Sequence, residues 1–112
     1  MATTAGNLPA RWVIHTVGPV YAAHDDRSAL LADCHRNSLR VADEVGARSV
    51  AFPAISTGIY GWPIDNAALI ALRAVAETPT DVGEVTFVLF DDRALVAFRS
   101  AADTLGLAVA ID

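Results

Sequence analysis

The stretch that decides the fold is Ser49-Val50-Ala51-Phe52-Pro53-Ala54-Ile55, followed directly by Ser56-Thr57-Gly58-Ile59-Tyr60-Gly61. The first segment is a compact apolar run, which predicts a buried strand. The second contains two glycines, which permit positive φ and a close approach of the backbone to a ligand. Pro63 then opens a helical pattern, because proline suits the first position of a helix. A turn between a strand and a helix can hold an anion through its backbone amides.

A plain glycine-containing turn is the alternative interpretation of residues 56–61, and their spacing alone does not decide between the two. A Walker loop is excluded, because it requires a terminal Gly-Lys-Ser/Thr and this chain contains no lysine.

Strands and helices alternate on both sides of this stretch. Apolar, β-branched runs predict two further strands, Trp12 to Val17 and Val85 to Phe90. Helical spacing of apolar residues predicts three helices: about Ser28 to Val45 with Asp26 or Ser28 as its cap, Pro63 to about Thr78, and Asp91 to a stop at Gly106. The order predicts an α/β fold with a mostly parallel sheet. Ligands of such sheets lie outside the carboxyl ends of the strands, where Gly18-Pro19, the 56–61 turn and Phe90-Asp91 all fall.

Composition narrows the classes of partner. The 112 residues predict one domain, 1–112, and the net charge is −5 with eight scattered arginines as the basic residues. Nucleic acid is not an expected partner, because that binding needs a basic face. No apolar run approaches the roughly 18 residues that span a bilayer, so no membrane partner is expected. No secretory pattern begins the chain, and a cytoplasmic location is the expectation.

Three segments resemble, in order, the consecutive signatures of MacroD-type macrodomains: Trp12-Val13-Ile14-His15-Thr16-Val17-Gly18-Pro19, Cys34-His35-Arg36-Asn37-Ser38-Leu39, and Ala51 to Gly61. With Val88-Leu89-Phe90-Asp91-Asp92, the resemblance covers about Leu8 to Leu105. It implies a three-layer αβα fold that lacks the family's N-terminal strands. It also implies binding of ADP-ribose or a derivative, in a family that includes hydrolases of O-acyl-ADP-ribose, such as deacetylases, and of mono-ADP-ribosylated proteins.

The resemblance also implies the roles of individual residues. Ser56, Thr57, Gly58, Ile59, Tyr60 and Gly61 would wrap the diphosphate of ADP-ribose, with Tyr60 near the distal ribose. Phe90 would stack on the adenine, whereas its alternative interpretation is simple packing in the core. No metal site and no cofactor are expected, because no histidine pair has the spacing of a zinc site.

Other reactive side chains favour structural interpretations. His15, in a predicted buried strand, is expected in the core, and His35 on the flank of a helix. Cys34 lies on the apolar stripe of its helix and is expected to be buried and inert. Asp91 and Asp92 are expected to stabilise the start of a helix.

The pattern breaks at the front of the chain. The family carries an Asn-Ala-Ala-Asn segment and a glycine-rich loop with an Asp, which help to position the attacking water in hydrolytic members, and no residue of this chain matches them. The catalytic residues are therefore unknown and the question of enzymatic activity stays open. A misassigned start in a GC-rich gene and a genuine fragment are competing explanations of the shortness.

The leading hypothesis is an ADP-ribose-binding, truncated macrodomain. The alternatives are a non-catalytic fragment that oligomerises through an exposed sheet edge, and an unrelated phosphate-binding fold. The absent family strand would separate Trp12–Val17 from Ser49–Ile55. Because vacant backbone groups in a buried sheet are costly, we expect these two strands to pair directly or to accept another chain between them.

Overall fold

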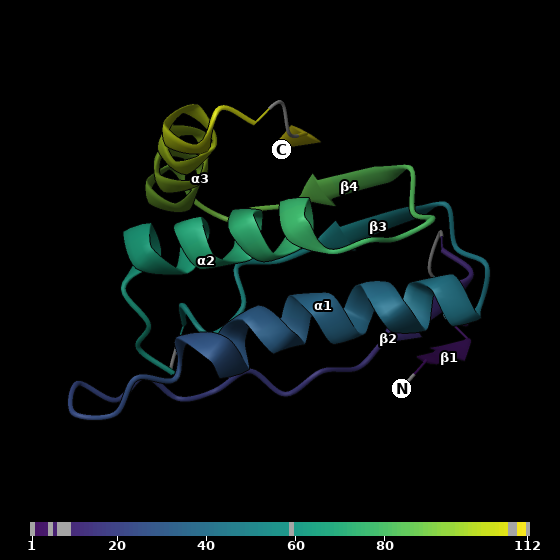
Figure 1. Cartoon of the computed structure of the whole chain (residues 1–112), viewed down its shortest axis with the longest axis horizontal. Helices are drawn as coiled ribbons and strands as arrows, with labels where there is room; N and C mark the ends of the chain where they lie inside the picture. Colours follow the sequence, from purple (N-terminus) through teal and green to yellow (C-terminus); the bar gives the residue numbers. More distant parts are fainter. Residues whose placement is uncertain (1, 5, 7–9, 59, 108–109, 112) are drawn as a thin grey trace.

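The computed structural model describes residues 2–4, 6, 10–58, 60–107 and 110–111. The elements, in order, are β1 (Ala2–Thr4), β2 (Trp12–Ile14), α1 (Ser28–Glu44), β3 (Ser49–Phe52), α2 (Ile64–Glu77), β4 (Glu84–Phe87), α3 (Asp92–Leu105) and β5 (Ala110–Ile111) (Figure 1). The three predicted helices are confirmed close to their expected bounds. The three predicted strands exist but are shorter at their carboxyl ends, and β1 and β5 were not predicted. None of the helices described is long and apolar enough to span a bilayer.

The strands form two separate sheets. In the larger sheet the order is β3-β4-β5, and both pairings are parallel, as the alternation of strands and helices predicts. Ser49 lies beside Glu84 and Phe52 beside Phe87. In the smaller sheet β1 and β2 pair in antiparallel fashion, with Thr3 opposite Val13. Of the two outcomes expected for the strands at Trp12 and Ser49, direct pairing is wrong for the described residues, and insertion of another chain between them stays a prediction.

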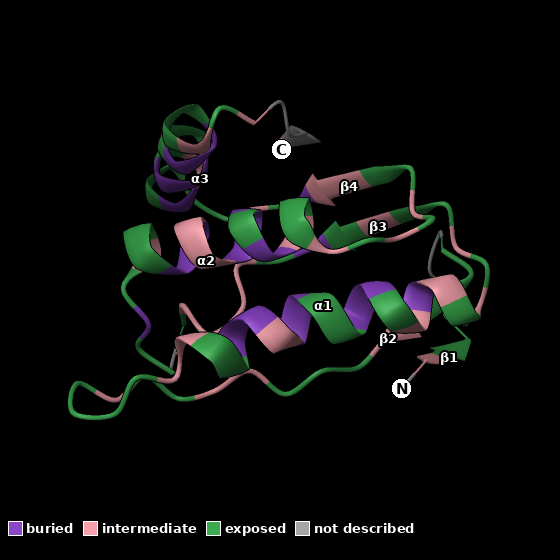
Figure 2. Cartoon of the chain, viewed as in Figure 1, coloured by how far each residue is buried: buried purple, intermediate pink, exposed green. Residues whose placement is uncertain are grey.

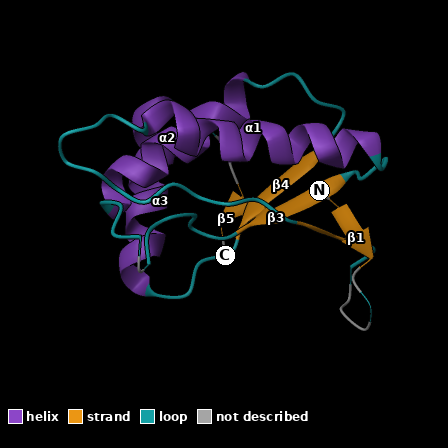
Figure 3. Cartoon of the chain, turned by 90° about the horizontal axis from the view of Figure 1, so that it is seen from below, coloured by secondary structure: helices purple, strands orange, loops and turns teal. Residues whose placement is uncertain are grey.

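All three helices contribute to one core against the larger sheet. Phe52 and Phe87, on neighbouring strands, stack with ring centroids 5.7 Å apart. His35 of α1 lies 5.1 Å from Phe52, and Phe98 of α3 lies 5.2 Å from Phe87, again between ring centroids. Small residues of α2 fill the space between the other two helices: Ala67, Ala68, Ala71 and Ala74. Figure 3 shows α1 and α2 on one side of the strands.

The burial pattern follows this one-sided packing (Figure 2). Along β3, Phe52 is buried while Ser49 and Ala51 are exposed. Along β4, Phe87 is buried while Glu84 is exposed. Because successive side chains of a strand point to opposite faces, the sheet is covered on the face of Phe52 and Phe87 and open to solvent on the other.

Local signals fix the ends of α2 and α3. Asp91 caps α3, since its carboxylate accepts a hydrogen bond of 2.8 Å from the Ala94 amide, as expected for a residue at a helix start. Gly106 ends the same helix in the left-handed conformation, with φ of 67°, which suits glycine. Pro63 is the cap residue of α2, with ψ of 127°. The helix therefore begins at Ile64, one residue later than predicted.

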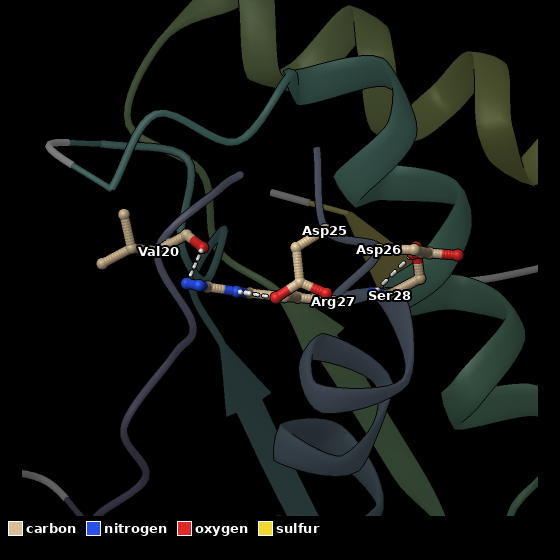
Figure 4. A network of polar contacts seen from close by, with 5 residues as sticks. All are labelled: Val20, Asp25, Asp26, Arg27 and Ser28. Atoms are coloured by element: carbon tan, nitrogen blue, oxygen red, sulfur yellow. Dashed lines mark hydrogen bonds and ion pairs between the residues drawn. The ribbon is translucent and has the colours of Figure 1, made fainter. Parts of the chain in front are cut away.

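The start of α1 is held by a small polar network (Figure 4). Arg27 is the cap residue, so the prediction of Asp26 or Ser28 is wrong, although the Asp26 carboxylate does accept a 2.9 Å hydrogen bond from the Ser28 amide. Hydrogen bonds from Ser28 lower the pKa of Asp26. The Arg27 guanidinium donates to the Val20 carbonyl at 3.1 Å and pairs with Asp25 at 3.1 Å. The long segment after β2 is thereby tied to the first turn of the helix.

The burial of two histidines differs from the prediction. His15 is exposed, because the short β1–β2 ribbon is not covered on both faces. Its Nε2 lies 3.0 Å from the Thr3 hydroxyl. His35, expected on a helix flank, is only 1% exposed and sits against the aromatic rings of the core. Its Nδ1 donates to the Leu31 carbonyl at 3.0 Å, and its Nε2 has no partner among the described residues. Cys34 is buried as predicted.

His35 makes the stability of this fold sensitive to mild acid. Burial lowers its pKa from the ordinary value of 6.5, against a smaller opposite effect of the bond to Leu31. The unfolded chain therefore binds this proton first, and the stabilisation present above about pH 6.5 is lost as the pH falls through the lowered pKa.

We expect the free energy of unfolding to fall between about pH 7 and pH 5, by at most about 1.4 kcal/mol per pH unit from this one group. Urea denaturation at several pH values measures it. His35→Phe should flatten the dependence, whereas His24→Asn, a change in the exposed loop, should preserve it. An unchanged slope in His35→Phe would contradict this assignment.

Candidate functional site

The 56–61 turn closes on itself directly after β3. The Thr57 hydroxyl donates to the Ala54 carbonyl at 2.9 Å, and the Gly61 amide donates to the Gly58 carbonyl at 3.0 Å. The Trp62 amide donates to the Ser56 carbonyl at 2.9 Å, which joins the two ends of the turn. These bonds connect the described residues of the turn to one another and to the end of β3, which lowers the backbone entropy that they would lose on binding.

Two amides of this turn remain available. Among the described residues, the backbone N–H groups of Gly58 and Tyr60 donate no hydrogen bond. Ile59, the predicted contact residue between Gly58 and Tyr60, lies outside the described residues. Gly61 has φ of 74°, a left-handed conformation that glycine adopts without steric cost. Gly58 does not have positive φ. Both Gly58 and Tyr60 are exposed residues.

Ser56 begins the turn in a strained conformation. Its φ of 67° is the only positive value at a non-glycine residue among those described. Its hydroxyl oxygen is buried and has no hydrogen-bond partner in the described chain. The backbone of Gly18 packs directly against this side chain, since a Cβ added at Gly18 would collide with Ser56 Oγ and lie 2.7 Å from Ile55 Cγ2. The segment after β2 therefore supports the turn from one side.

Aromatic residues outside the turn complete this support. The Tyr21 amide donates to the Tyr60 carbonyl at 2.9 Å, and the Tyr21 ring meets Trp62 edge-on with centroids 5.5 Å apart. Trp62 is buried, and its indole N–H donates to the Asn66 side chain at 2.9 Å. Sequence reasoning placed Gly18 at the ligand-binding ends of the strands without naming it as a contact, and did not assign Tyr21 or Trp62 to the site. Their positions just after a strand end or the turn were the available signal.

Phe90 stands clear of the core. Its exposed fraction is 91%, so the interpretation of this residue as core packing is wrong. It follows β4, whose continuation is bonded to β3 through the Val88 amide and the Phe52 carbonyl at 2.8 Å. Phe90 and the 56–61 turn therefore leave neighbouring parallel strands at the same edge of the sheet. The ring of Tyr60, 38% exposed, is the other accessible aromatic group among the predicted site residues.

The site is an open surface rather than a closed cavity. A shallow cavity of about 460 Å³ lies between the first turns of α2 and α3, and its lining includes Pro63, Asp65, Asp92 and Arg93. None of the predicted ligand contacts lines it. Within the described residues, no cluster of three or more histidine, cysteine or acidic side chains could hold a metal ion.

A parallel α/β domain with a glycine-containing turn at the carboxyl edge of its sheet is typical of proteins that bind nucleotides or phosphates. The chain belongs to the macro domain family, whose model matches residues 1–71. The macrodomain-like α/β fold is confirmed by this match and by similarity to solved structures.

Three known proteins illustrate the similarity. A macro domain-containing protein of Streptomyces coelicolor, SCO6450, is 68% identical over 100 residues, which cover 89% of this chain and 59% of that protein. A Klebsiella pneumoniae protein named O-acetyl-ADP-ribose deacetylase is 48% identical over 101 residues, 87% of this chain and 58% of that protein. A mutant Oceanobacillus iheyensis macrodomain solved with ADPR matches with a TM-score of 0.87 and 40% identity, over 94% of this chain and 58% of that one. The chain thus spans about three fifths of each.

The contact between Gly18 and Ser56 gives a prediction for stability. We expect Gly18→Ala to lower the free energy of unfolding by about 1–3 kcal/mol, because an overpacked methyl must displace the Ser56 and Ile55 side chains. Gly58→Ala is the matched control, since its added Cβ meets no described atom within 4 Å and φ is not positive. Chemical denaturation compares the two. Equal stability of both variants would show that Gly18 does not support the turn.

Proposed function

We propose that this chain recognises ADP-ribose or a molecule that carries it, through the 56–61 turn and Phe90. The observation that carries the proposal is the pairing of a pre-closed turn with two unpaired amides and a phenyl ring that is 91% exposed, at the same sheet edge. The first would bind a diphosphate and the second a base. The relatives named for ADP-ribose chemistry, or solved with ADPR, support this choice of ligand.

The diphosphate would be held without a lysine. The amides of Gly58 and Tyr60 would donate to phosphate oxygens, and the adjoining start of α2 would add the partial positive charge of a helix N-terminus. Ser56, Thr57, Ile59 and Gly61 would complete the wrapping of the diphosphate as backbone scaffold. An anion is compatible with a net charge of −5 because these donors are fixed dipoles and not mobile charges.

Phe90 would stack on the adenine. An exposed phenyl ring gains most when a flat apolar surface covers it, and base stacking on an aromatic side chain contributes about 1–3 kcal/mol. Tyr60 would lie near the distal ribose, held in place by the bond between its carbonyl and the Tyr21 amide. Such a module would act in the cytoplasm.

We propose recognition rather than hydrolysis for this chain. His15 and Asp91 are the first side chains to consider as a general acid or base. His15 lies at hydrogen-bond distance from Thr3 on the β1–β2 ribbon, and Asp91 caps α3. The resemblance assigns the water-positioning Asn and Asp to a segment that no residue of this chain matches.

We expect Gly58→Glu to weaken ADP-ribose binding at least about 100-fold, because a carboxylate about 4 Å from a phosphate is unfavourable by about 4 kcal/mol at an effective dielectric constant of 20. Titration calorimetry measures it. Gly83→Glu is the matched control. It adds the same charge at another non-positive φ, with Arg48 O at 3.7 Å as its nearest described atom, far along the chain from the turn.

The fold should survive in both variants, since neither position is sterically closed. Equal affinity of Gly58→Glu and Gly83→Glu would reject the turn as the diphosphate site. Loss of binding in both would point to charge repulsion by the whole acidic chain.

We also expect turnover of O-acetyl-ADP-ribose by this chain to be negligible, even at ligand concentrations that saturate it. Positioning of the attacking water is worth several orders of magnitude in rate, and its loss lowers kcat rather than affinity. Acetate release is measured beside the Klebsiella pneumoniae relative, of which this chain spans 58%. Comparable kcat for both proteins would place the chemistry within residues 1–112.

A further inference from the structure

We propose that Arg27 is a positioning residue of the candidate site, and that it acts on the 56–61 turn through two hydrogen-bonded peptide units. The first unit joins Val20 to Tyr21, and the second joins Tyr60 to Gly61. The proposal rests on the proposed function, because the ligand that the turn would hold is ADP-ribose. It gives a role in binding to a side chain that lies outside the turn.

The residue type at the start of α1 points to a role outside the helix. Ser, Thr, Asp and Asn are the usual helix caps, and a cation at this end opposes the helix dipole. Arg27 is nevertheless the cap residue of α1, and no side-chain hydrogen bond caps this helix. Its backbone carbonyl accepts from the Leu31 amide at 3.1 Å. The helix thus uses the main chain of Arg27 and not its guanidinium.

The guanidinium is directed toward the segment that precedes the helix (Figure 4). Its Nη1 donates to the Val20 carbonyl at 3.1 Å, and its Nε donates to the Asp25 carboxylate, also at 3.1 Å. Two contacts from one rigid, planar group fix its orientation. The Arg27 side chain is 36% exposed, whereas Arg36 and Arg40, in the other ion pairs of the described residues, are 45% and 65% exposed. The contacts of Arg27 are therefore the least screened by solvent.

The peptide bond transmits the contact at Val20 to the turn. The Val20 carbonyl and the Tyr21 amide belong to one planar unit and point in opposite directions. While the carbonyl accepts from Arg27, the amide donates to the Tyr60 carbonyl at 2.9 Å. This unit is therefore held at both ends, by the guanidinium on one side and by the turn on the other.

The second peptide unit carries the contact into the turn. The Tyr60 carbonyl shares a planar unit with the Gly61 amide, which donates to the Gly58 carbonyl at 3.0 Å. Gly58 and Tyr60 are the residues whose amides donate no hydrogen bond within the described chain. Hydrogen bonds in a row strengthen one another, and a charged donor at one end makes the first bond stronger. The charge of Arg27 therefore stabilises the turn conformation in which both amides are free.

The ring of Tyr21 leaves one freedom that only the guanidinium removes. The ring meets Trp62 edge-on with centroids 5.5 Å apart, and the Trp62 indole is bonded to Asn66 of α2. These contacts hold Tyr21 beside the turn. The peptide unit before Tyr21 can still rotate about its flanking single bonds. The bond from Arg27 to the Val20 carbonyl opposes that rotation and keeps the Tyr21 amide directed at Tyr60.

An ion pair without effect on the turn is the competing interpretation, since many surface ion pairs contribute nothing measurable. The same helix provides a matched control. Arg36 pairs with Asp33 at 2.9 Å, one turn further along α1, and the described contacts of its side chain end there. Arg36→Met and Arg27→Met remove the same charge, so an effect of net charge on an anionic ligand is common to both.

Titration calorimetry with ADP-ribose compares the two variants. We expect Arg27→Met to bind about three- to tenfold more weakly than the parent, because part of the turn must then be ordered by the ligand. Arg36→Met should bind like the parent. Arg27→Lys keeps a cationic donor and should recover part of the lost affinity. Equal affinity of Arg27→Met and Arg36→Met would overturn the proposal.

Amide hydrogen exchange of the unliganded chain tests the link directly. We expect the amides of Tyr21 and Gly61 to exchange at least about tenfold faster in Arg27→Met than in the parent. The Val88 amide, which donates to the Phe52 carbonyl outside this row of bonds, should be unchanged. Unchanged exchange at Tyr21 would overturn the proposal. Faster exchange at all three amides would also overturn it, because it would show a general loosening of the fold.

The two measurements separate this inference from the proposed function. If the parent chain binds ADP-ribose and Arg27→Met binds it equally well, the proposed function stands and the inference fails. If the parent chain does not bind ADP-ribose, the proposed function fails, and exchange at Tyr21 and Gly61 decides whether Arg27 fixes the turn. Should Arg27→Met not fold, the same comparison is made with Arg27→Gln and Arg36→Gln.

Discussion

The stack of Phe52 on Phe87 is the contact on which the rest of the structure depends. The two rings belong to adjacent parallel strands, and each also meets a helix, through His35 on one side and Phe98 on the other. Burial of these large apolar surfaces supplies the main driving force of such a fold. Because β3 and β4 run parallel and each leads into a helix, the segments that connect these strands to their helices leave the sheet at the same end.

The groups at the carboxyl ends of β3 and β4 determine which ligands this end of the sheet can bind. The 56–61 turn follows β3 and Phe90 follows β4, so the two leave the carboxyl ends of neighbouring parallel strands. An acidic protein can offer an anion site in this way because backbone dipoles carry no net charge. The strained φ of Ser56 is maintained by the packing of Gly18, which makes the shape of the turn a property of two distant segments.

Much of this architecture could be predicted from sequence. Helical spacing and the stop at Gly106 located the helices, and the glycine turn between a strand and a helix located the candidate site. His15 and His35 were misplaced because periodicity reports a face of an element and not whether another element covers it. β1 and β5 have only three and two residues, too few to form a pattern. The position of Gly18 after a strand was visible in the sequence, whereas its contact with Ser56 and the bond between Tyr21 and Tyr60 are tertiary contacts that no local pattern contains.

The weak attachment of the β1–β2 ribbon bears on local unfolding of the chain. A ribbon of two three-residue strands has little stability of its own, and it is joined to the main body through α1 and through the segment at Gly18. The aromatic core makes no use of it. We therefore expect partial opening to begin at this ribbon, before the helices and the parallel strands separate. Proteases acting on the native protein will find their first cleavage sites in this ribbon.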